Sequence, residues 1–133
     1  MRSWAEINLD NLRHNINILK TIAGDSMLLP AIKANAYGHG LEEIFNVLVS
    51  EGIKWVGVAT FNEAEKLREL DKSTNILIFG PIETEDMRKA IDMNIAFPLT
   101  SLDEIDFLNE NNLAPRVHLK VDTGMGRIGF DPA

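Results

Sequence analysis

Residues 55–80 read WVGVATFNEAEKLRELDKSTNILIFG and contain two short apolar runs on either side of a polar segment. The runs at 55–59 and 75–79 have the length and composition of buried β-strands. Between them, apolar residues recur at the three-residue spacing of a helix, which Asn62 is predicted to cap. A strand, a helix and a second strand that is apolar on both faces are typical of a parallel α/β sheet.

The same alternation extends over the rest of the chain. Asp10 is predicted to cap a first helix that ends at Gly24, and Ser101 with Glu104 forms a predicted capping box. Further strands are predicted at 27–32, 95–97 and 116–121. Further helices are predicted at 41–49, 83–93 and 101–111.

Five parallel strands with intervening helices fit two architectures. One is an open doubly wound sheet, and the other is part of an eight-stranded α/β barrel. A complete barrel needs roughly 250 residues, so this chain cannot hold one. The chain also stops in the loop after a strand, and we therefore expect it to be a piece of a longer barrel.

The composition is ordinary for a folded acidic domain, with 45% hydrophobic and 25% charged residues. Thirteen Lys and Arg against twenty Asp and Glu give a net charge of −7, so a nucleic-acid partner is not expected. No apolar run reaches the roughly 20 residues of a membrane helix, and no signal peptide is recognised. We therefore expect a cytoplasmic protein without a membrane partner. The lack of cysteine excludes disulfides and thiolate catalysis.

The segment IKANAYGHG at 32–40 places a lysine directly after a predicted strand. Lys33 lies at the carboxyl end of that strand, which faces the active site in both architectures. Partial burial there favours a neutral amine, which can form a Schiff base with an aldehyde. Gly38 and Gly40 precede a helix whose first amides are predicted to bind an anion, together with the hydroxyl of Tyr37. An aldehyde with an anion indicates pyridoxal phosphate, and the alternative is a solvated lysine.

A second glycine-rich segment, KVDTGMGRIG at 120–129, follows the last predicted strand at the same edge. Arg127 is suited to binding a carboxylate through two parallel hydrogen bonds. Lys120 and Asp122 alternate onto one side of their strand. The alternative is a surface turn with a solvated arginine and a lysine paired to an acid.

The spans IKANAYGHG and HLKVDTGMGRIGF resemble alanine racemase, a pyridoxal-phosphate enzyme of fold type III. WAEINLDNLRHNI, GVATFNEAEKLRE and ILIFG resemble the same family in the same order, so the resemblance covers nearly the whole chain. It favours a partial (β/α)8 barrel, in which residues 1–133 are the N-terminal part of the cofactor-binding domain without the family's C-terminal β domain. It implies a cytoplasmic, homodimeric bacterial isomerase that interconverts L-alanine and D-alanine for the cell wall.

The resemblance also implies roles for five residues. Lys33 matches the lysine that holds the cofactor covalently and serves as one of two catalytic bases, and Tyr37 matches a tyrosine that binds the cofactor phosphate. Arg127 matches an arginine near the cofactor's phenolic oxygen and the substrate carboxylate. Lys120 matches a lysine that is carbamylated in many members and then orients that arginine. Phe79 falls where the family has a cofactor-lining residue, often leucine.

The second base of the family is a tyrosine from the C-terminal domain of the partner subunit. This chain has one tyrosine, Tyr37, to which the resemblance gives the phosphate role. The later barrel strands, which supply more of the phosphate site and an arginine at the pyridine nitrogen, are absent as well. We therefore expect the isolated chain not to racemise alanine.

Two other functions stay open. A pyridoxal-phosphate amino-acid decarboxylase of the same fold type has its lysine in a similar K-A-N context, although the Y-G-H-G continuation favours the racemase. The other possible function is that of a non-catalytic barrel fragment. Such a fragment would associate with itself, or with a complementing fragment, through open strand edges. The sequence leaves the preference between alanine and serine open.

No catalytic or binding role is predicted for the histidines or for the charged residues at 63–69. His14, His39 and His118 lie in a helix, a loop and a strand without ligand spacing, so no metal site is expected. The charged residues at 63–69 are expected to form a solvated helix face with intrahelical ion pairs.

Overall fold

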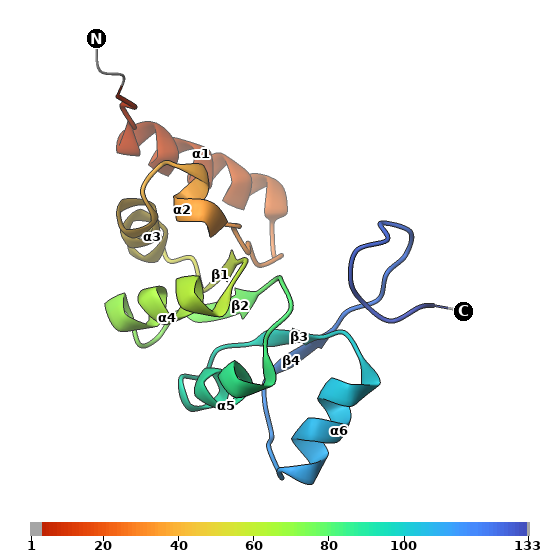
Figure 1. The fold of residues 1–133 in the computed structure, drawn as a ribbon. Helices are drawn as coiled ribbons and strands as arrows, with labels where there is room; N and C mark the ends of the chain where they lie inside the picture. Colours follow the sequence, from red (N-terminus) through yellow and green to blue (C-terminus); the bar gives the residue numbers. More distant parts are fainter. Residues whose placement is uncertain (1–3, 133) are drawn as a thin grey trace.

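In the computed structural model, which describes residues 4–132, helices alternate with short strands (Figure 1). The strands are β1 (Trp55–Val58), β2 (Asn75–Ile78), β3 (Phe97–Leu99) and β4 (Val117–Leu119). The helices are α1 (Leu9–Ala23), α2 (Lys33–Tyr37), α3 (Leu41–Ser50), α4 (Phe61–Leu70), α5 (Thr84–Asp92) and α6 (Leu102–Glu110).

The strands follow one another across the sheet in sequence order. β1 pairs with β2 and β3 pairs with β4, each in parallel. A single parallel bridge between Leu77 and Ala96 links the two pairs. A second one, between Ala31 and Gly57, adds the first predicted strand beside β1. A doubly wound sheet reverses its strand order at a switch point, whereas a barrel does not. The prediction of a partial barrel is therefore confirmed, with one of its five strands reduced to a bridge.

Two strands differ from their predicted bounds, and proline explains both. The strand predicted at 27–32 forms its bridge at Ala31, directly after Pro30, which has no N–H for a ladder. The strand predicted at 95–97 continues through Pro98, which was expected to end it, and Pro98 lies opposite His118. The N–H of Phe97 and the carbonyl group of Leu99 form the hydrogen bonds from β3 to the chain of β4. The N–H that Pro98 lacks would point to the opposite side of β3, so its absence removes no bond to β4.

Two helices begin two residues earlier than predicted. The side chain of Asn8, rather than Asp10, caps α1, and Thr60, rather than Asn62, caps α4. Both observed caps have extended backbone angles, which the cap position requires. The capping box predicted at Ser101 is confirmed at the start of α6.

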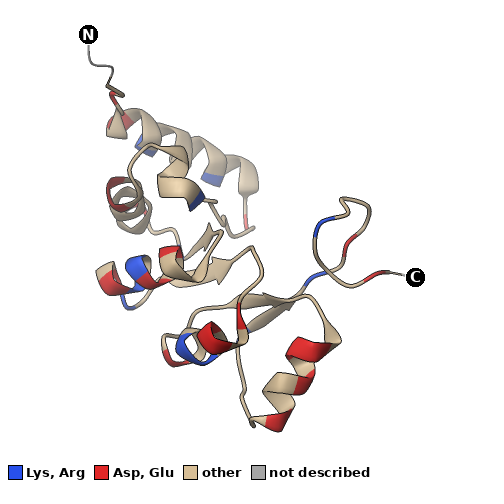
Figure 2. Cartoon of the chain, in the orientation of Figure 1, with Lys and Arg blue, Asp and Glu red and all other residues tan. Residues whose placement is uncertain are grey.

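The core lies between the strands and the helices. Val56 and Val58 of β1 and Ile76 and Ile78 of β2 are almost completely buried, and α4 packs against both strands. Figure 2 shows the strands free of charged residues, while Asp and Glu gather on α6 and the other helices. The charged residues are thus outside the four strands.

The opposite face of the sheet carries the residues that alternate with these. At its amino end, the Trp55 ring lies 4.9 Å from the Arg116 guanidinium and 6.1 Å from the His118 ring. In a closed barrel this face would be the interior. His118 is exposed, and its ring contacts the Trp55 ring edge to face.

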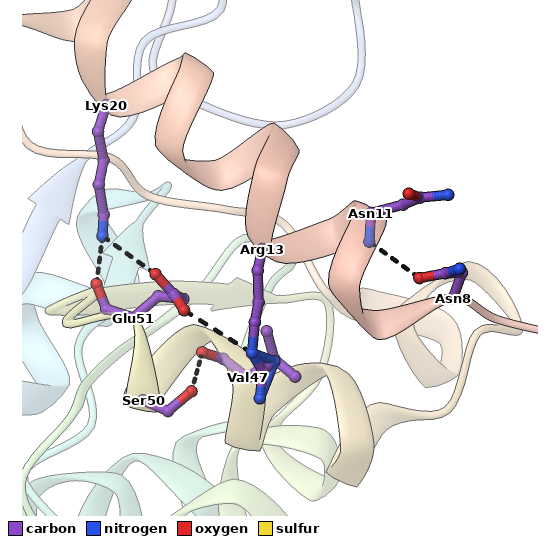
Figure 3. A network of polar contacts seen from close by, with 7 residues as sticks. All are labelled: Asn8, Asn11, Arg13, Lys20, Val47, Ser50 and Glu51. Carbon is purple, nitrogen blue, oxygen red and sulfur yellow. Dashed lines mark hydrogen bonds and ion pairs between the residues drawn. The ribbon is translucent and has the colours of Figure 1, made fainter.

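Helix α1 is held against α3 by Glu51, the residue that ends α3 (Figure 3). Nζ of Lys20 lies 3.8 Å from one carboxylate oxygen of Glu51 and also donates to its carbonyl oxygen. Nε of Arg13 lies 3.8 Å from the other carboxylate oxygen. Two cations that lie about two turns apart on α1 thus converge on one acid.

Candidate active site

The predicted site residues follow the carboxyl ends of parallel strands. Lys33 comes two residues after the bridge at Ala31, and Phe79 comes directly after β2. Lys120 comes directly after β4, and Arg127 lies in the loop that follows. Since all these strands run in one direction, the residues lie along one edge of the sheet.

The segment labelled α2, directly after Lys33, is a left-handed turn rather than an ordinary helix or the open loop that the sequence suggested. The φ angles of Ala34, Asn35, Ala36 and Tyr37 lie between 52° and 55°. A left-handed conformation costs roughly 1–2 kcal/mol per residue for side chains other than glycine. Such conformations persist where the surrounding structure holds them, and they gather at functional sites.

Several hydrogen bonds hold this turn. The Asn35 side chain accepts a hydrogen bond of 2.8 Å from the Leu41 N–H, and the Asn35 carbonyl accepts one of 3.1 Å from the Gly40 N–H. On its other side, the Ala34 N–H donates to Oε1 of Glu63, over 2.6 Å. The turn is therefore tied both to the start of α3 and to the start of α4.

The anion site predicted at the start of α3 does not fit this arrangement. The first helical amide, that of Leu41, is already bound by Asn35. The first turn also carries Glu42 and Glu43, whose carboxylates repel an anion. Two groups were predicted to bind the anion, the first helical amides and the hydroxyl of Tyr37. Of these, only the hydroxyl of Tyr37 fits that role in the structure, and Tyr37 is 58% exposed.

Phe79 lies against the backbone of the neighbouring strand. A Cβ on Gly57 would lie 1.9 Å from Cζ of Phe79, so the ring occupies the space above that glycine. Gly57 is bridged to Ala31, two residues before Lys33. The Phe79 ring therefore covers β1, the strand that lies between the Lys33 segment and β2. Gly57 was a signal for this close approach, since glycine is otherwise unfavourable inside a strand.

Asp122 organises the loop that carries Arg127. Its carboxylate accepts hydrogen bonds from the N–H groups of Gly124 and Gly126, each 3.0 Å, and of Arg127, 2.9 Å. These bonds, from Gly124 first, lower the pKa of Asp122. The loop then returns to the sheet, where Phe130 forms a parallel bridge with Val121. Sequence reasoning placed Asp122 on the same side of the strand as Lys120, with an ion pair between a lysine and an acid as the alternative, and missed this role.

The functional ends of the candidate side chains are available to a ligand. Tyr37 is exposed and Lys120 is half-buried. Lys33 is half-buried and Arg127 is exposed. An amine, a hydroxyl, a guanidinium and an aromatic ring along one edge fit an aldehyde cofactor with a phosphate group and a substrate with a carboxylate.

Two further expectations concern metals and membranes. Among the residues that the structure describes, no three His, Asp or Glu side chains form a group that could hold a metal ion. None of the helices in residues 4–132 is long and apolar enough to cross a membrane.

Comparison with known proteins gives the family. The model for the alanine racemase N-terminal domain matches residues 7–133. The chain belongs to the alanine racemase family. An alanine racemase of Fusobacterium nucleatum is 40% identical over 131 residues, which are 98% of this chain and 37% of that protein. The chain therefore spans little more than a third of the length of this relative.

Solved structures of the family share the fold. An alanine racemase of Clostridium difficile 630 matches with a TM-score of 0.87 and 35% identity, over all of this chain and 36% of its own. A histidine racemase from Leuconostoc mesenteroides matches with a TM-score of 0.84 and 30% identity, over 92% of this chain and 34% of its own. The alanine racemase fold is thus shared with a racemase named for another amino acid.

Proposed function

We propose that residues 1–133 are the N-terminal part of a pyridoxal-phosphate-binding barrel domain. In this proposal the domain serves the interconversion of L-alanine and D-alanine for bacterial cell-wall synthesis, in a cytoplasmic homodimer. The observation that carries the proposal is the position of Lys33 and Arg127 along one sheet edge, in a chain of the alanine racemase family. The absence of the family's C-terminal β domain from these residues is part of the same proposal.

Each candidate residue then has a chemical task. Pyridoxal phosphate supplies an aldehyde and an electron-withdrawing ring that acidifies the substrate Cα–H. The amine of Lys33 would hold the aldehyde, and as a free amine it would take or return the Cα proton on one face of the substrate. The Tyr37 hydroxyl donates to the phosphate, and Arg127 binds the substrate carboxylate. Carbamylation of Lys120 would give it a negative charge that orients Arg127, while the Phe79 ring excludes water from one side.

Racemisation needs a second base on the opposite face of the substrate. The chain has a single tyrosine, Tyr37, and the proposal uses it for the phosphate. We therefore predict that the purified 133-residue protein with added cofactor forms no D-alanine above the rate of free cofactor. Chiral chromatography of the reaction with L-alanine checks this, and robust D-alanine formation would contradict the assignment.

Cofactor binding is tested by absorbance. Addition of pyridoxal phosphate to the folded chain should produce the visible absorption band of a lysine adduct, and Lys33→Ala should abolish it. Lys54 is a matched control because it is exposed and precedes β1, at the opposite edge of the sheet. Lys54→Ala should leave the band unchanged. A folded wild-type chain without the band would contradict cofactor binding by these residues.

The substrate is proposed from the family rather than from the site. Arg127 would bind the carboxylate of any amino acid, so it does not distinguish alanine from serine. The family match favours a racemase over the decarboxylase. Initial rates of Cα-hydrogen exchange with alanine and with serine, in an assembly that supplies the second base, would rank the two substrates.

A non-catalytic, self-associating role is favoured by one observation. Val117, Leu119 and Val121, which alternate along β4 and beyond it, are 38%, 66% and 43% exposed. Such an apolar row at the last strand favours association with another copy or with a complementing chain. Sedimentation velocity over a range of concentrations should reveal association that Leu119→Lys weakens. A monomer at all concentrations would exclude self-association.

A further inference from the structure

Helices α4 and α6 begin with the same capping box, and the two boxes differ in one contact. In α4, the Glu63 N–H donates to Thr60 and the Glu63 carboxylate accepts from the Thr60 N–H. In α6, Glu104 and Ser101 exchange the same pair of bonds. In each box, the carboxylate oxygen Oε2 also accepts from the N–H of the residue before the cap, Ala59 or Thr100.

The difference lies in the other carboxylate oxygen. Oε1 of Glu104 accepts a local bond of 3.0 Å from the Thr100 hydroxyl. The equivalent residue of α4 is Ala59, which has no hydroxyl, and Oε1 of Glu63 instead accepts the Ala34 N–H over 2.6 Å. One glutamate thus caps its own helix, and the other also reaches 29 residues back along the chain.

The long-range bond of Glu63 lies where the backbone needs support. Ala34 is the first residue of the left-handed turn, and it directly follows Lys33. Its N–H has a charged acceptor, which makes a stronger bond than a neutral one. Loss of this bond would remove one of the ties that hold an unfavourable conformation beside the lysine.

We propose that Glu63 is a positioning residue for Lys33. Its carboxylate binds the Ala34 N–H, holds the left-handed turn against the start of α4, and so fixes the direction in which Lys33 leaves its strand. The effect on cofactor capture rests on the proposed function, whereas the effect on the turn does not.

The first experiment measures amide hydrogen exchange by NMR in the cofactor-free chain. Glu63→Ala should accelerate exchange of the Ala34 amide about five- to tenfold relative to the Ile78 amide, as expected for loss of one charge-assisted hydrogen bond. Glu104→Ala removes the matched capping box and should leave Ala34 within about twofold of wild type. Glu63→Met, which retains most of the volume of the side chain and has no acceptor oxygen, tests the same point if Glu63→Ala does not fold.

The second experiment measures cofactor capture at Lys33. Pyridoxal phosphate and borohydride are added, and the ratio of labelled Lys33 to labelled Lys54 is read by mass spectrometry. Glu63→Ala should lower this ratio at least threefold, and Glu104→Ala should not change it, although both lose a helix cap. A merely structural role would affect the two variants alike.

The outcomes separate the two proposals. Unchanged Ala34 exchange in a folded Glu63 variant, or equal acceleration in Glu104→Ala, would overturn the positioning role. Accelerated exchange with an unchanged labelling ratio would overturn it as well. If wild-type Lys33 is not labelled more than Lys54, the proposal that Lys33 binds the cofactor is wrong. The exchange rate of the Ala34 amide then tests only whether Glu63 supports the turn.

Discussion

At the scale of single residues, Asp122 shows how one carboxylate can fix a loop that carries a functional side chain. Three backbone N–H groups, including that of Arg127, converge on it. The sequence contained a signal for this turn, because an aspartate readily bonds to the backbone two residues later. The pattern did not indicate that the same carboxylate would also accept from Gly126 and Arg127.

The pKa of Asp122 predicts how this loop responds to acid. Its pKa in the folded chain is below the ordinary value of 3.8, so the carboxylate stabilises the loop at higher pH and ceases to do so as the pH falls through the folded pKa. Amide shifts of Gly124 and Gly126 should titrate together with a midpoint below 3.8. Asp122→Asn should abolish the titration, whereas a midpoint above 3.8 would show that the three bonds are not made.

Gly57 is a second residue whose role depends on a single contact. Gly57→Ala would place a Cβ 1.9 Å from the Phe79 ring, which must then move. Overpacking of this kind costs about 1–3 kcal/mol, and we expect that loss in the free energy of unfolding measured with urea. In a Phe79→Ala background the cost should fall below about 1 kcal/mol. Equal costs in the two backgrounds would mean that Phe79 does not occupy this space.

At the scale of secondary-structure elements, Arg68 joins three segments. Its guanidinium donates to the carbonyl oxygens of Met93 (2.9 Å), Thr74 (2.8 Å), Asp71 (3.1 Å) and Asn94 (3.1 Å). The side chain comes from α4, and the acceptors lie before β2 and after α5. Only 5% of Arg68 is exposed, and burial lowers its pKa. The sequence placed it on a solvated helix face, which is wrong.

Removal of this guanidinium should destabilise the fold. Arg68→Met leaves four carbonyl groups without their donor, and buried polar groups without partners cost about 1–3 kcal/mol each before relaxation. We expect a loss of about 3–5 kcal/mol in urea unfolding. Arg88→Met, on the exposed side of α5, should cost less than about 1 kcal/mol. Similar losses for both variants would refute the role of Arg68.

The elements themselves could be predicted because their signals are local. Apolar runs and helical spacing give the strands and helices, and the Ser101 capping box gives the start of α6. Helix starts at Asn8 and Thr60 were missed because two cap-forming residues stood two positions apart in each case. Which of them caps depends on backbone angles that the residue types do not fix.

At the scale of the whole molecule, the order of the strands distinguishes a barrel from a doubly wound sheet. Local patterns left both architectures open, because each uses the same strand–helix–strand unit. Only the parallel bridges at Ala31 and Ala96 show that the order continues without reversal. The common edge of the site residues could be predicted, since it depends on strand direction alone.

The left-handed turn after Lys33 could not be predicted in the same way. Asn35 tolerates this conformation, but Ala34, Ala36 and Tyr37 do not favour it. The turn is instead held by contacts from Leu41 and Glu63, which lie outside the segment. Local residue types cannot reveal a conformation that distant partners impose.

The central claim is that the amine of Lys33 is the group that takes the cofactor aldehyde. Borohydride reduction of the chain with pyridoxal phosphate near stoichiometry, followed by peptide mapping, tests it most directly. The account predicts that the label falls on the peptide that contains Lys33, in preference to exposed lysines such as Lys54 and Lys89. A label spread evenly over the exposed lysines, or absent from Lys33 in a folded chain, would contradict it.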